Sequence, residues 1–333
     1  MGSDTWALPA LRRTGSTVVC DRPAGGLAAV RLVGAAAGPA GDAPAWEALG
    51  AELRVSPGEV AFEVPAARLE EAVRLLAPPD PEDSTLSPRH AARSRLLARL
   101  RGSWQAGTLV VVGEVGDFSG QRAERLLKLC GPALPPGPAG PVAVEAAPLA
   151  LPWEGALQAH VAIGYRVPGR EDHVAWAALT VACRVLGEGL FTRLNRVLRE
   201  ELGRTYGFTA SLDPGPGGAV LLVQGAVGDE KATKLALGIL RETASHGVGA
   251  EECERAVTAC LDGAWSRFES AAGLADELAS LAAAGLPPEW LSGHLEALGR
   301  LDAATVSEVL GKHLVAPVVV TAGRPSIRSY PRW

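Results

Sequence analysis

The sequence predicts an α+β protein of two homologous domains, each a mainly antiparallel sheet with helices on one face, the first of them trimmed. Its 333 residues suit two domains better than one. A Pro/Gly-rich stretch at 131–152 lacks helical periodicity and is typical of a linker, so the expected domains are 1–130 and 153–333. In both halves similar segments follow in the same order, which indicates an internal duplication.

The first half begins with short apolar runs that predict strands at 16–20 and 27–34. A Leu-Gly pair then precedes Ala51–Val64, which predicts a hairpin that turns at Ser56-Pro57-Gly58. Apolar residues at helical spacing follow, and a Val-rich run closes the half as a buried strand. The predicted helices are 65–77 and 89–102, and the closing strand is 108–116.

The second half opens with a predicted strand and two predicted helices. The strand is 157–167, and the helices are 171–187 and 191–203. Asp172 stands near the start of the first helix. Gly203 ends the second helix, because glycine readily adopts the left-handed conformation that commonly closes a helix.

A second hairpin, at 205–227, is expected to turn at Asp213-Pro214-Gly215. The amphipathic helix 229–247 follows, with Asp229 as its N-cap. Three further helical segments come next, and a buried strand at 316–323 completes the half. The Leu-Gly pair, the hairpin, the amphipathic helix and the Val-rich strand therefore occur twice.

The composition excludes several classes of protein. Hydrophobic residues make up 47% of the chain and charged residues 21%, which is typical of a globular protein with a full core. The net charge of −5 does not favour a nucleic-acid or anionic-membrane partner. Five cysteines without a C-x-x-C pair indicate reduced, buried thiols. Because no signal-peptide pattern or long apolar stretch occurs, a cytoplasmic location is expected.

Most motifs of enzyme chemistry are absent from the sequence. Neither G-x-x-x-x-G-K-[ST] nor G-x-S-x-G occurs, and "GEG" at 187–189 is too short for a dinucleotide fingerprint. The histidines are His90, His160, His173, His246, His294 and His313. None has another His or Cys within four residues, whereas a zinc site needs clustered ligands. The residues alone therefore identify no catalyst.

Two neighbouring motifs carry a family resemblance. They are "LGEGLFTRL" at 186–194 and "REELGRTY" at 199–206. In residue types, spacing and element order the second half resembles the C-terminal part of insulinase–pitrilysin (inverzincin) zinc peptidase subunits, which include the mitochondrial and bacterial processing peptidases. Arg199 and Tyr206 occupy that family's arginine and tyrosine positions. The resemblance extends more faintly through the first half in the family's order.

The first half departs from the family pattern at the metal site. Active members carry H-x-x-E-H on a helix after the second strand, where two histidines bind zinc and the glutamate is the general base. Here the corresponding stretch, 34–49, contains no histidine. The stretch "RHAARSRLLARL", where a further zinc-binding glutamate is expected, contains no acid. The resemblance therefore implies no metal in this chain and zinc in a homologous H-x-x-E-H partner.

By this resemblance, the chain is the non-catalytic subunit of a heterodimeric bacterial processing peptidase. Tyr206 is expected to stabilise the tetrahedral intermediate, and Arg199 to hold substrate carbonyls. Gly187, Gly189 and Leu190 form a loop expected to touch substrate, although a tight turn explains the glycines equally well. Arg193 is expected to be structural.

Two questions stay open at the level of sequence. The trimmed first half suggests a dedicated role, such as removal of a leader from a peptide precursor. The alternative is a non-enzymatic scaffold or peptide-binding subunit of the same fold, which would have no need of Arg199 or Tyr206.

Overall fold

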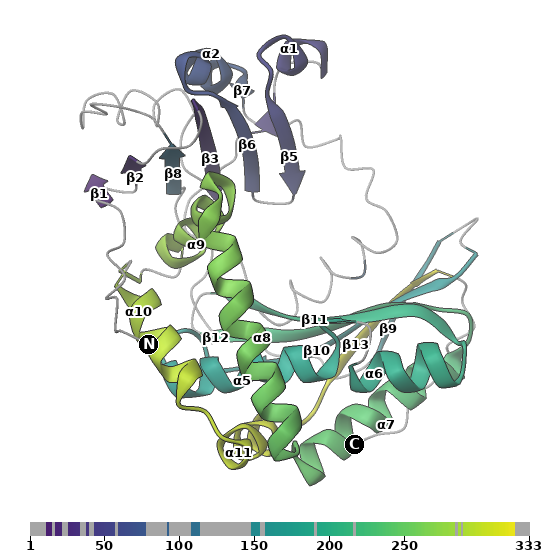
Figure 1. The fold of residues 1–333 in the computed structure, drawn as a ribbon. Coiled ribbons are helices and arrows are strands. Elements are labelled where there is room, and N and C mark those ends of the chain that lie inside the picture. Colours follow the sequence, from purple (N-terminus) through teal and green to yellow (C-terminus); the bar gives the residue numbers. More distant parts are fainter. Residues whose placement is uncertain are drawn as a thin grey trace. The chain divides into compact units, whose positions relative to one another are not determined.

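The computed structural model describes most of the second half of the chain and the framework of the first half. The described residues are 11–14, 17–21, 26–33, 38–39, 43–56, 59–77, 92, 108–113, 148–153, 157–189, 192–215, 218–283, 286–287 and 289–323. The chain forms two compact units. The first unit comprises 1–84, 104–137 and 263–292, and the second comprises 85–103, 138–262 and 293–333. Each unit combines a main sheet with helices (Figure 1), so the predicted α+β class is confirmed.

The first unit is built on a six-stranded sheet in the order β1-β2-β8-β3-β6-β5. Its strands are β1 (Leu11–Thr14), β2 (Thr17–Asp21), β3 (Leu27–Val33), β5 (Glu52–Ser56), β6 (Glu59–Pro65) and β8 (Thr108–Gly113). Neighbouring strands run antiparallel, except that β2 and β8 are parallel. The predicted hairpin is β5–β6, in which Ser56 pairs with Glu59.

Smaller elements surround this sheet. They are the strands β4 (Gly38–Pro39) and β7 (Leu76–Ala77), the helices α1 (Ala43–Ala48) and α2 (Leu69–Arg74), and the 3₁₀ helix η1 (Ala66–Arg68). β4 and β7 pair with each other in a separate two-stranded sheet. The predicted helix 65–77 is thus observed as η1 and α2. The predicted helix 89–102 lies outside the described residues except for Ala92.

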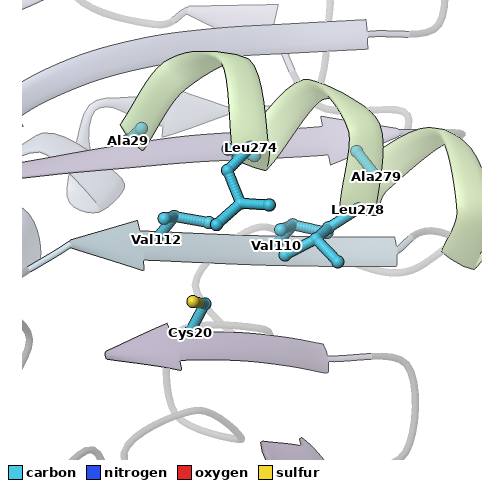
Figure 2. Close-up of a cluster of buried hydrophobic side chains, with 8 residues drawn as sticks. Cys20, Ala29, Val110, Val112, Leu274, Leu278 and Ala279 are labelled. Carbon is cyan, nitrogen blue, oxygen red and sulfur yellow. The ribbon is translucent and has the colours of Figure 1, made fainter. Parts of the chain in front are cut away.

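Helix α9 (Ala271–Ala283) packs on the sheet of the first unit, although it lies far along the chain. Figure 2 shows Leu278 beside Val110 of β8. The buried cluster consists of Cys20, Ala29, Val110, Val112, Leu274, Ala275, Leu278 and Ala279. The sequence predicts that all of 153–333 belongs to the second domain, whereas 263–292 lie in the first unit. Helical periodicity indicates which face of α9 is apolar, but not which sheet that face will cover.

A buried arginine ties α9 to this sheet. Arg31 on β3 is fully buried, and its Nε donates a hydrogen bond to Oδ1 of Asp276 on α9. Its other nitrogens donate to the carbonyl oxygens of Val30, at 2.9 Å, and Ala272, at 3.3 Å. A guanidinium is tolerated in the core because its charge and its N–H donors are matched.

The second unit is built on a five-stranded sheet in the order β11-β12-β10-β13-β9. Its strands are β9 (Leu149–Pro152), β10 (Ala159–Val167), β11 (Thr205–Gly215), β12 (Gly218–Val227) and β13 (Val318–Gly323). Neighbouring strands run antiparallel, except that β13 and β9 are parallel. β11 forms one edge of the sheet.

Helices α5, α7 and α11 lie on the same side of this sheet (Figure 1). The helices of the second half are α5 (His173–Leu186), α6 (Arg193–Asn195), the π-helix η2 (Arg196–Glu201), α7 (Glu230–His246), α8 (Ala250–Glu269), α10 (Trp290–Gly299) and α11 (Ala303–His313), besides α9. The predicted N-cap Asp229 is confirmed, because its Oδ1 accepts a hydrogen bond from the Ala232 N–H at 2.9 Å. Asp172 caps α5 in the same way, through the Ala175 N–H at 3.0 Å.

Five strands of the first sheet, all except β1, have the same topology as the second sheet. In the first unit the order is β5-β6-β3-β8-β2. The hairpin β5–β6 lies at the edge, β3 and β8 follow as antiparallel neighbours, and β2 is parallel to β8. In the second unit the order β11-β12-β10-β13-β9 repeats this arrangement and its strand directions. Such a match is what duplication of one α+β unit produces.

Three details differ from the sequence expectations. The second hairpin turns between Gly215 and Gly218, which pair with each other, and not at 213–215. Pro214 is tolerated within β11 because an edge strand has no partner on one side. β9 lies inside the expected linker 131–152, of which 131–147 lie outside the described residues. Four described helices, not three, follow α7.

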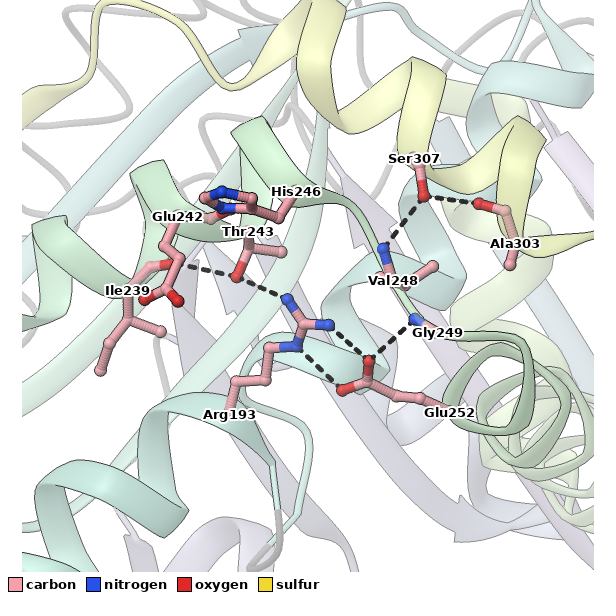
Figure 3. Close-up of polar contacts among 10 residues, drawn as sticks. All are labelled: Arg193, Ile239, Glu242, Thr243, His246, Val248, Gly249, Glu252, Ala303 and Ser307. Carbon is pink, nitrogen blue, oxygen red and sulfur yellow. Dashed lines mark hydrogen bonds and ion pairs between the residues drawn. The ribbon is translucent and has the colours of Figure 1, made fainter.

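Arg193 joins three helices of the second unit (Figure 3). Its Nε and one terminal nitrogen donate to the two carboxylate oxygens of Glu252 on α8, at 2.9 and 2.6 Å. Its other terminal nitrogen donates to Oγ1 of Thr243 on α7, at 3.2 Å. Burial acts to raise the pKa of the Glu252 carboxyl, but the hydrogen bonds and charge of Arg193, aided by the Gly249 N–H, hold it below its usual value. The structural role expected of Arg193 is therefore observed.

No described helix is both long enough and apolar enough to cross a membrane.

Replacing Glu252 by Gln should lower the free energy of unfolding at pH 7 by about 1–2 kcal/mol, because Arg193 loses its charged partner. A carboxylate with a lowered folded-state pKa stabilises the fold fully above its unfolded pKa, and this stabilisation is lost as the pH falls through the folded pKa. In urea titrations the difference between wild type and variant should therefore shrink below roughly pH 4.3. Glu254→Gln, at an exposed position of the same helix, is the control. A difference that stays constant with pH would contradict the ion pair.

Replacing Asp276 by Ala should destabilise the fold by about 2–3 kcal/mol, because it leaves the buried Arg31 without its counter-charge. Adding Arg31→Met should restore part of this loss, since the apolar side chain needs no partner. Chemical unfolding of the single and double variants measures both effects. If the double variant were less stable than Asp276→Ala, the unpaired charge would not be the cause.

Candidate functional site

The predicted glycine loop begins where α5 ends. The N–H groups of Gly187 and Glu188 both donate to the carbonyl oxygen of Cys183, at 3.0 and 3.1 Å, and so close the helix. The loop then lies directly against β11. A Cβ added at Gly187 would stand 2.7 Å from the backbone nitrogen of Ala210, so only glycine allows this close approach.

Gly189 serves a different purpose in the same loop. Its φ of +137° is one that L side chains rarely adopt, although space for a side chain is available. Its carbonyl oxygen accepts hydrogen bonds from Oγ1 of Thr192, at 3.2 Å, and from Nδ2 of Asn195, at 2.6 Å. The loop is thus held by the first residues of the helix that follows it.

That helix widens into the π-helix η2, which carries Arg199. The N–H of Leu202 donates to the carbonyl oxygen of Val197, five residues earlier, at 3.1 Å. Gly203, at φ +60°, then ends the helix as predicted. The final bonds run from the Gly203 N–H to the Arg199 carbonyl, at 3.1 Å, and from the Arg204 N–H to the Leu198 carbonyl, at 2.8 Å.

The first unit contains the same helix end without the extra residue. Gly50, at φ +66°, ends α1 before the strand β5. Its N–H donates to the Glu47 carbonyl, three residues earlier, and the Ala51 N–H donates to the Trp46 carbonyl, five residues earlier. Each of these spans is one residue shorter than its counterpart at Gly203. The second unit therefore contains one additional helical residue at this point.

A second one-residue irregularity follows in β11. Thr205 pairs with Val227 of β12, but the next registered residue, Phe208, pairs with Gly225, so β11 has one extra residue between them. This is a β-bulge at Tyr206 and Gly207. In the first unit the register of β5 with β6 is continuous. The widened helix end and the β-bulge thus lie on either side of Gly203. Neither occurs at the equivalent helix end and hairpin of the first unit.

A pocket of about 440 Å³ opens at this place in the second unit. Four predicted site residues line it together, namely Gly187, Gly189, Arg199 and Tyr206. The other lining residues are Ala92, His160, Val161, Asn195, Gly207, Phe208, Thr209, Gln224, Gly225 and Ala226. Leu190, the fifth predicted residue, lies outside the described residues. Arg193 is not among the lining residues.

Arg199 and Tyr206 both have accessible side chains. The Arg199 side chain is 39% exposed, and its Nε lies 3.4 Å from a carboxylate oxygen of Glu200. Because an ion pair between such exposed groups is worth little, the guanidinium remains available for a ligand. Tyr206 is 82% exposed, which is unusual for a tyrosine.

Asn195 lines the pocket as well, although the sequence motifs did not indicate it as a site residue. It is buried, with 4% exposure, and its Oδ1 accepts a hydrogen bond from the Phe208 N–H at 2.6 Å. Its Nδ2 donates to the carbonyl oxygens of Phe208, at 2.9 Å, and Gly189, at 2.6 Å. The one available signal was composition, because Asn195 is the only asparagine in the chain.

The chemistry of the pocket is that of binding and charge stabilisation. It offers the guanidinium of Arg199, the phenol of Tyr206 and the imidazole of His160, and its described lining contains no carboxylate or thiol. Within the described part of the chain, no group of three His, Cys, Asp or Glu side chains could hold a metal ion. Burial raises the pKa of the Cys183 thiol, with smaller contributions from Glu188 and Cys260, so this thiol is a poor nucleophile.

Comparison with known proteins places the chain in a family. Residues 93–260, half of the chain, match the peptidase M16 inactive domain. A stretch of 108 residues is 33% identical to uncharacterized zinc proteases of Mycobacterium tuberculosis and Mycobacterium bovis. It covers 32% of this chain and 24% of each relative, so the match spans about a quarter of the length of these relatives.

Solved structures agree in fold over nearly the whole chain. A peptidase M16 inactive domain from Pseudomonas fluorescens superposes with a TM-score of 0.67 at 19% identity, covering 97% of this chain and 99% of that one. A putative M16-like peptidase from Alicyclobacillus acidocaldarius gives 0.62 at 13% identity, covering 94% and 97%. At such identities the likeness concerns the fold, and the family match carries the assignment. The chain belongs to the family of peptidase M16 inactive domains.

Proposed function

We propose that this chain is the zinc-free subunit of a heterodimeric metallopeptidase, in which a homologous H-x-x-E-H subunit binds the zinc ion. The observation that carries this proposal is the pocket that Arg199 and Tyr206 line together. Two one-residue irregularities flank the turn between them, and the matching hairpin of the first unit has neither. π-Helical turns and β-bulges are frequent at functional sites.

The proposed chemistry of Tyr206 follows from its exposure. When zinc-bound water attacks a peptide bond, negative charge develops on the carbonyl oxygen. A phenol hydroxyl aimed at this oxygen stabilises the tetrahedral intermediate. An exposed Tyr206 is free to donate this hydrogen bond to a substrate held between the two subunits.

Arg199 has the complementary task of holding the peptide. Its planar guanidinium presents several N–H donors in a fixed geometry, which suits the carbonyl oxygens of an extended chain. The weak pairing with Glu200 leaves this group available. The backbone of Gly187 and Gly189, which lines the same pocket without side chains, allows the peptide to approach closely.

The zinc ion and the general base belong to the partner in this proposal. The stretch 34–49 contains no histidine, and no described cluster of this chain suits a metal. The partner is identified by its sequence motif: co-purification of a homologous H-x-x-E-H subunit in equal amounts would support the heterodimer.

Removal of a leader from a peptide precursor is the reaction that we propose for the pair. Equal cleavage of unrelated short peptides would argue against this role.

A scaffold or peptide-binding subunit would require different features of this site. A subunit that only binds or supports its partner needs an intact fold and interface, but no exposed phenol in a pocket. Kinetics of the assembled pair therefore separate the two functions.

In the assembled pair, Tyr206→Phe should lower kcat by about 10²–10³-fold, because it removes one donor to the transition state while it keeps the ring. Assembly, followed by size-exclusion chromatography, should not change. Hydrolysis of a labelled peptide gives kcat and KM. Unchanged turnover in an intact complex would favour the scaffold.

Arg199→Ala should lower kcat/KM of the same pair by about 10- to 100-fold, the equivalent of a lost charged hydrogen bond. Arg196→Ala is the matched control, because Arg196 lies on the same π-helix, is 67% exposed and does not line the pocket. Arg199→Lys should recover only part of the loss, since an ammonium lacks the planar fork. Equal effects of the two alanine variants would reduce Arg199 to a general surface charge.

A further inference from the structure

Resting on the function proposed above, we infer that Asn195 and Thr205 are positioning residues, which hold the Tyr206 hydroxyl where the transition state requires it. Asn195 follows the first sequence motif directly and Thr205 lies within the second, but neither was a candidate site residue. Each anchors one end of the bulge that contains Tyr206.

Asn195 anchors the bulge at Phe208. Its amide accepts from the Phe208 N–H and donates to the Phe208 carbonyl, so it pairs with the edge of β11 much as another strand would. The same Nδ2 donates to the Gly189 carbonyl, which connects the bulge to the glycine loop. Because Asn195 is only 4% exposed, water competes little for these hydrogen bonds.

Thr205 anchors the other end of the bulge. Its Oγ1 donates to the carbonyl oxygen of Ala226 on β12, at 2.6 Å, and accepts from the Gly207 N–H, at 3.1 Å. Gly207 has φ +155°, a conformation that side chains rarely adopt. The hydroxyl thus replaces the regular strand pairing that the bulge interrupts.

These anchors matter because Tyr206 has little else to position it. An 82% exposed ring is not locked by packing, so its hydroxyl is located mainly by the backbone from which it projects. Tyr206 and Gly207 have no registered partner on β12, and this backbone is held by its two neighbours. A displacement of about 1 Å at a reacting group can cost about 10²-fold in rate.

A double-mutant cycle in the pair assembled with the H-x-x-E-H subunit tests this inference. Asn195→Asp keeps the shape and the acceptor but removes both donors. It should lower kcat by about 10- to 100-fold when Tyr206 is present, with KM changed little. In the Tyr206→Phe background the same change should cost less than about threefold, because no hydroxyl remains to be misplaced.

Two further variants keep the test decisive. Thr205→Val, which removes the second anchor, should couple to Tyr206→Phe in the same way, and this cycle decides the matter if Asn195→Asp does not fold. Ser307→Ala is the control, because the Ser307 hydroxyl also bridges two segments of the second unit, from the Val248 N–H to the Ala303 carbonyl, and does not line the pocket. Its effect should be small and equal in both backgrounds.

The outcomes separate the inference from the function on which it rests. If both anchor variants lowered kcat by equal factors with and without the Tyr206 hydroxyl, their role would be general stability, and the inference would be overturned. If Tyr206→Phe itself left kcat unchanged, the proposed function would fail together with the inference.

Discussion

The candidate site depends on one buried amide. Asn195 donates to the glycine loop and pairs with the backbone of β11, so it joins two segments that also approach each other closely at Gly187. Because β11 is an edge strand, its outward N–H and C=O groups need a partner, and Asn195 supplies one at Phe208. The bulge at Tyr206, the pocket and the loop are geometrically linked through this side chain.

The duplication supplies an internal reference for the site. Both units end a helix at a glycine of positive φ and continue into an edge hairpin. Of these two helix ends, only the one in the second unit is widened. Of the two hairpins, only β11–β12 has an interrupted strand register. Since the fold forms without these irregularities, their presence is not required by the architecture. Irregularities of this kind are frequent at functional sites, and here Asn195 and Thr205 hold the bulge in place.

The residues of the pocket define a limited chemistry. The guanidinium of Arg199 and the phenol of Tyr206 are suited to binding carbonyl oxygens and stabilising negative charge. His160 adds one imidazole to the lining, whereas a zinc site needs several ligands. Membership of the inactive-domain family agrees with this division. The proposed division of the chemistry between a zinc-binding subunit and a charge-stabilising subunit therefore gives this chain only a role that Arg199 and Tyr206 can perform. It also explains how a site can use an exposed tyrosine, which a partner would cover.

Local patterns in the sequence were sufficient for the α+β class, the repeated order of elements, the caps at Asp229 and Gly203, and the family, because periodicity, turn residues and short motifs are properties of neighbouring residues. They also identified Arg199 and Tyr206 as candidates. They could not indicate that α9 covers the first sheet, that the second hairpin turns after Gly215, or that Asn195 reaches β11. The cover of α9 depends on a contact between segments far apart in the chain, about which the pattern of either segment carries no information. The turn is set by the register of β11 with β12, and the reach of Asn195 depends on how η2 and the bulge place the two segments.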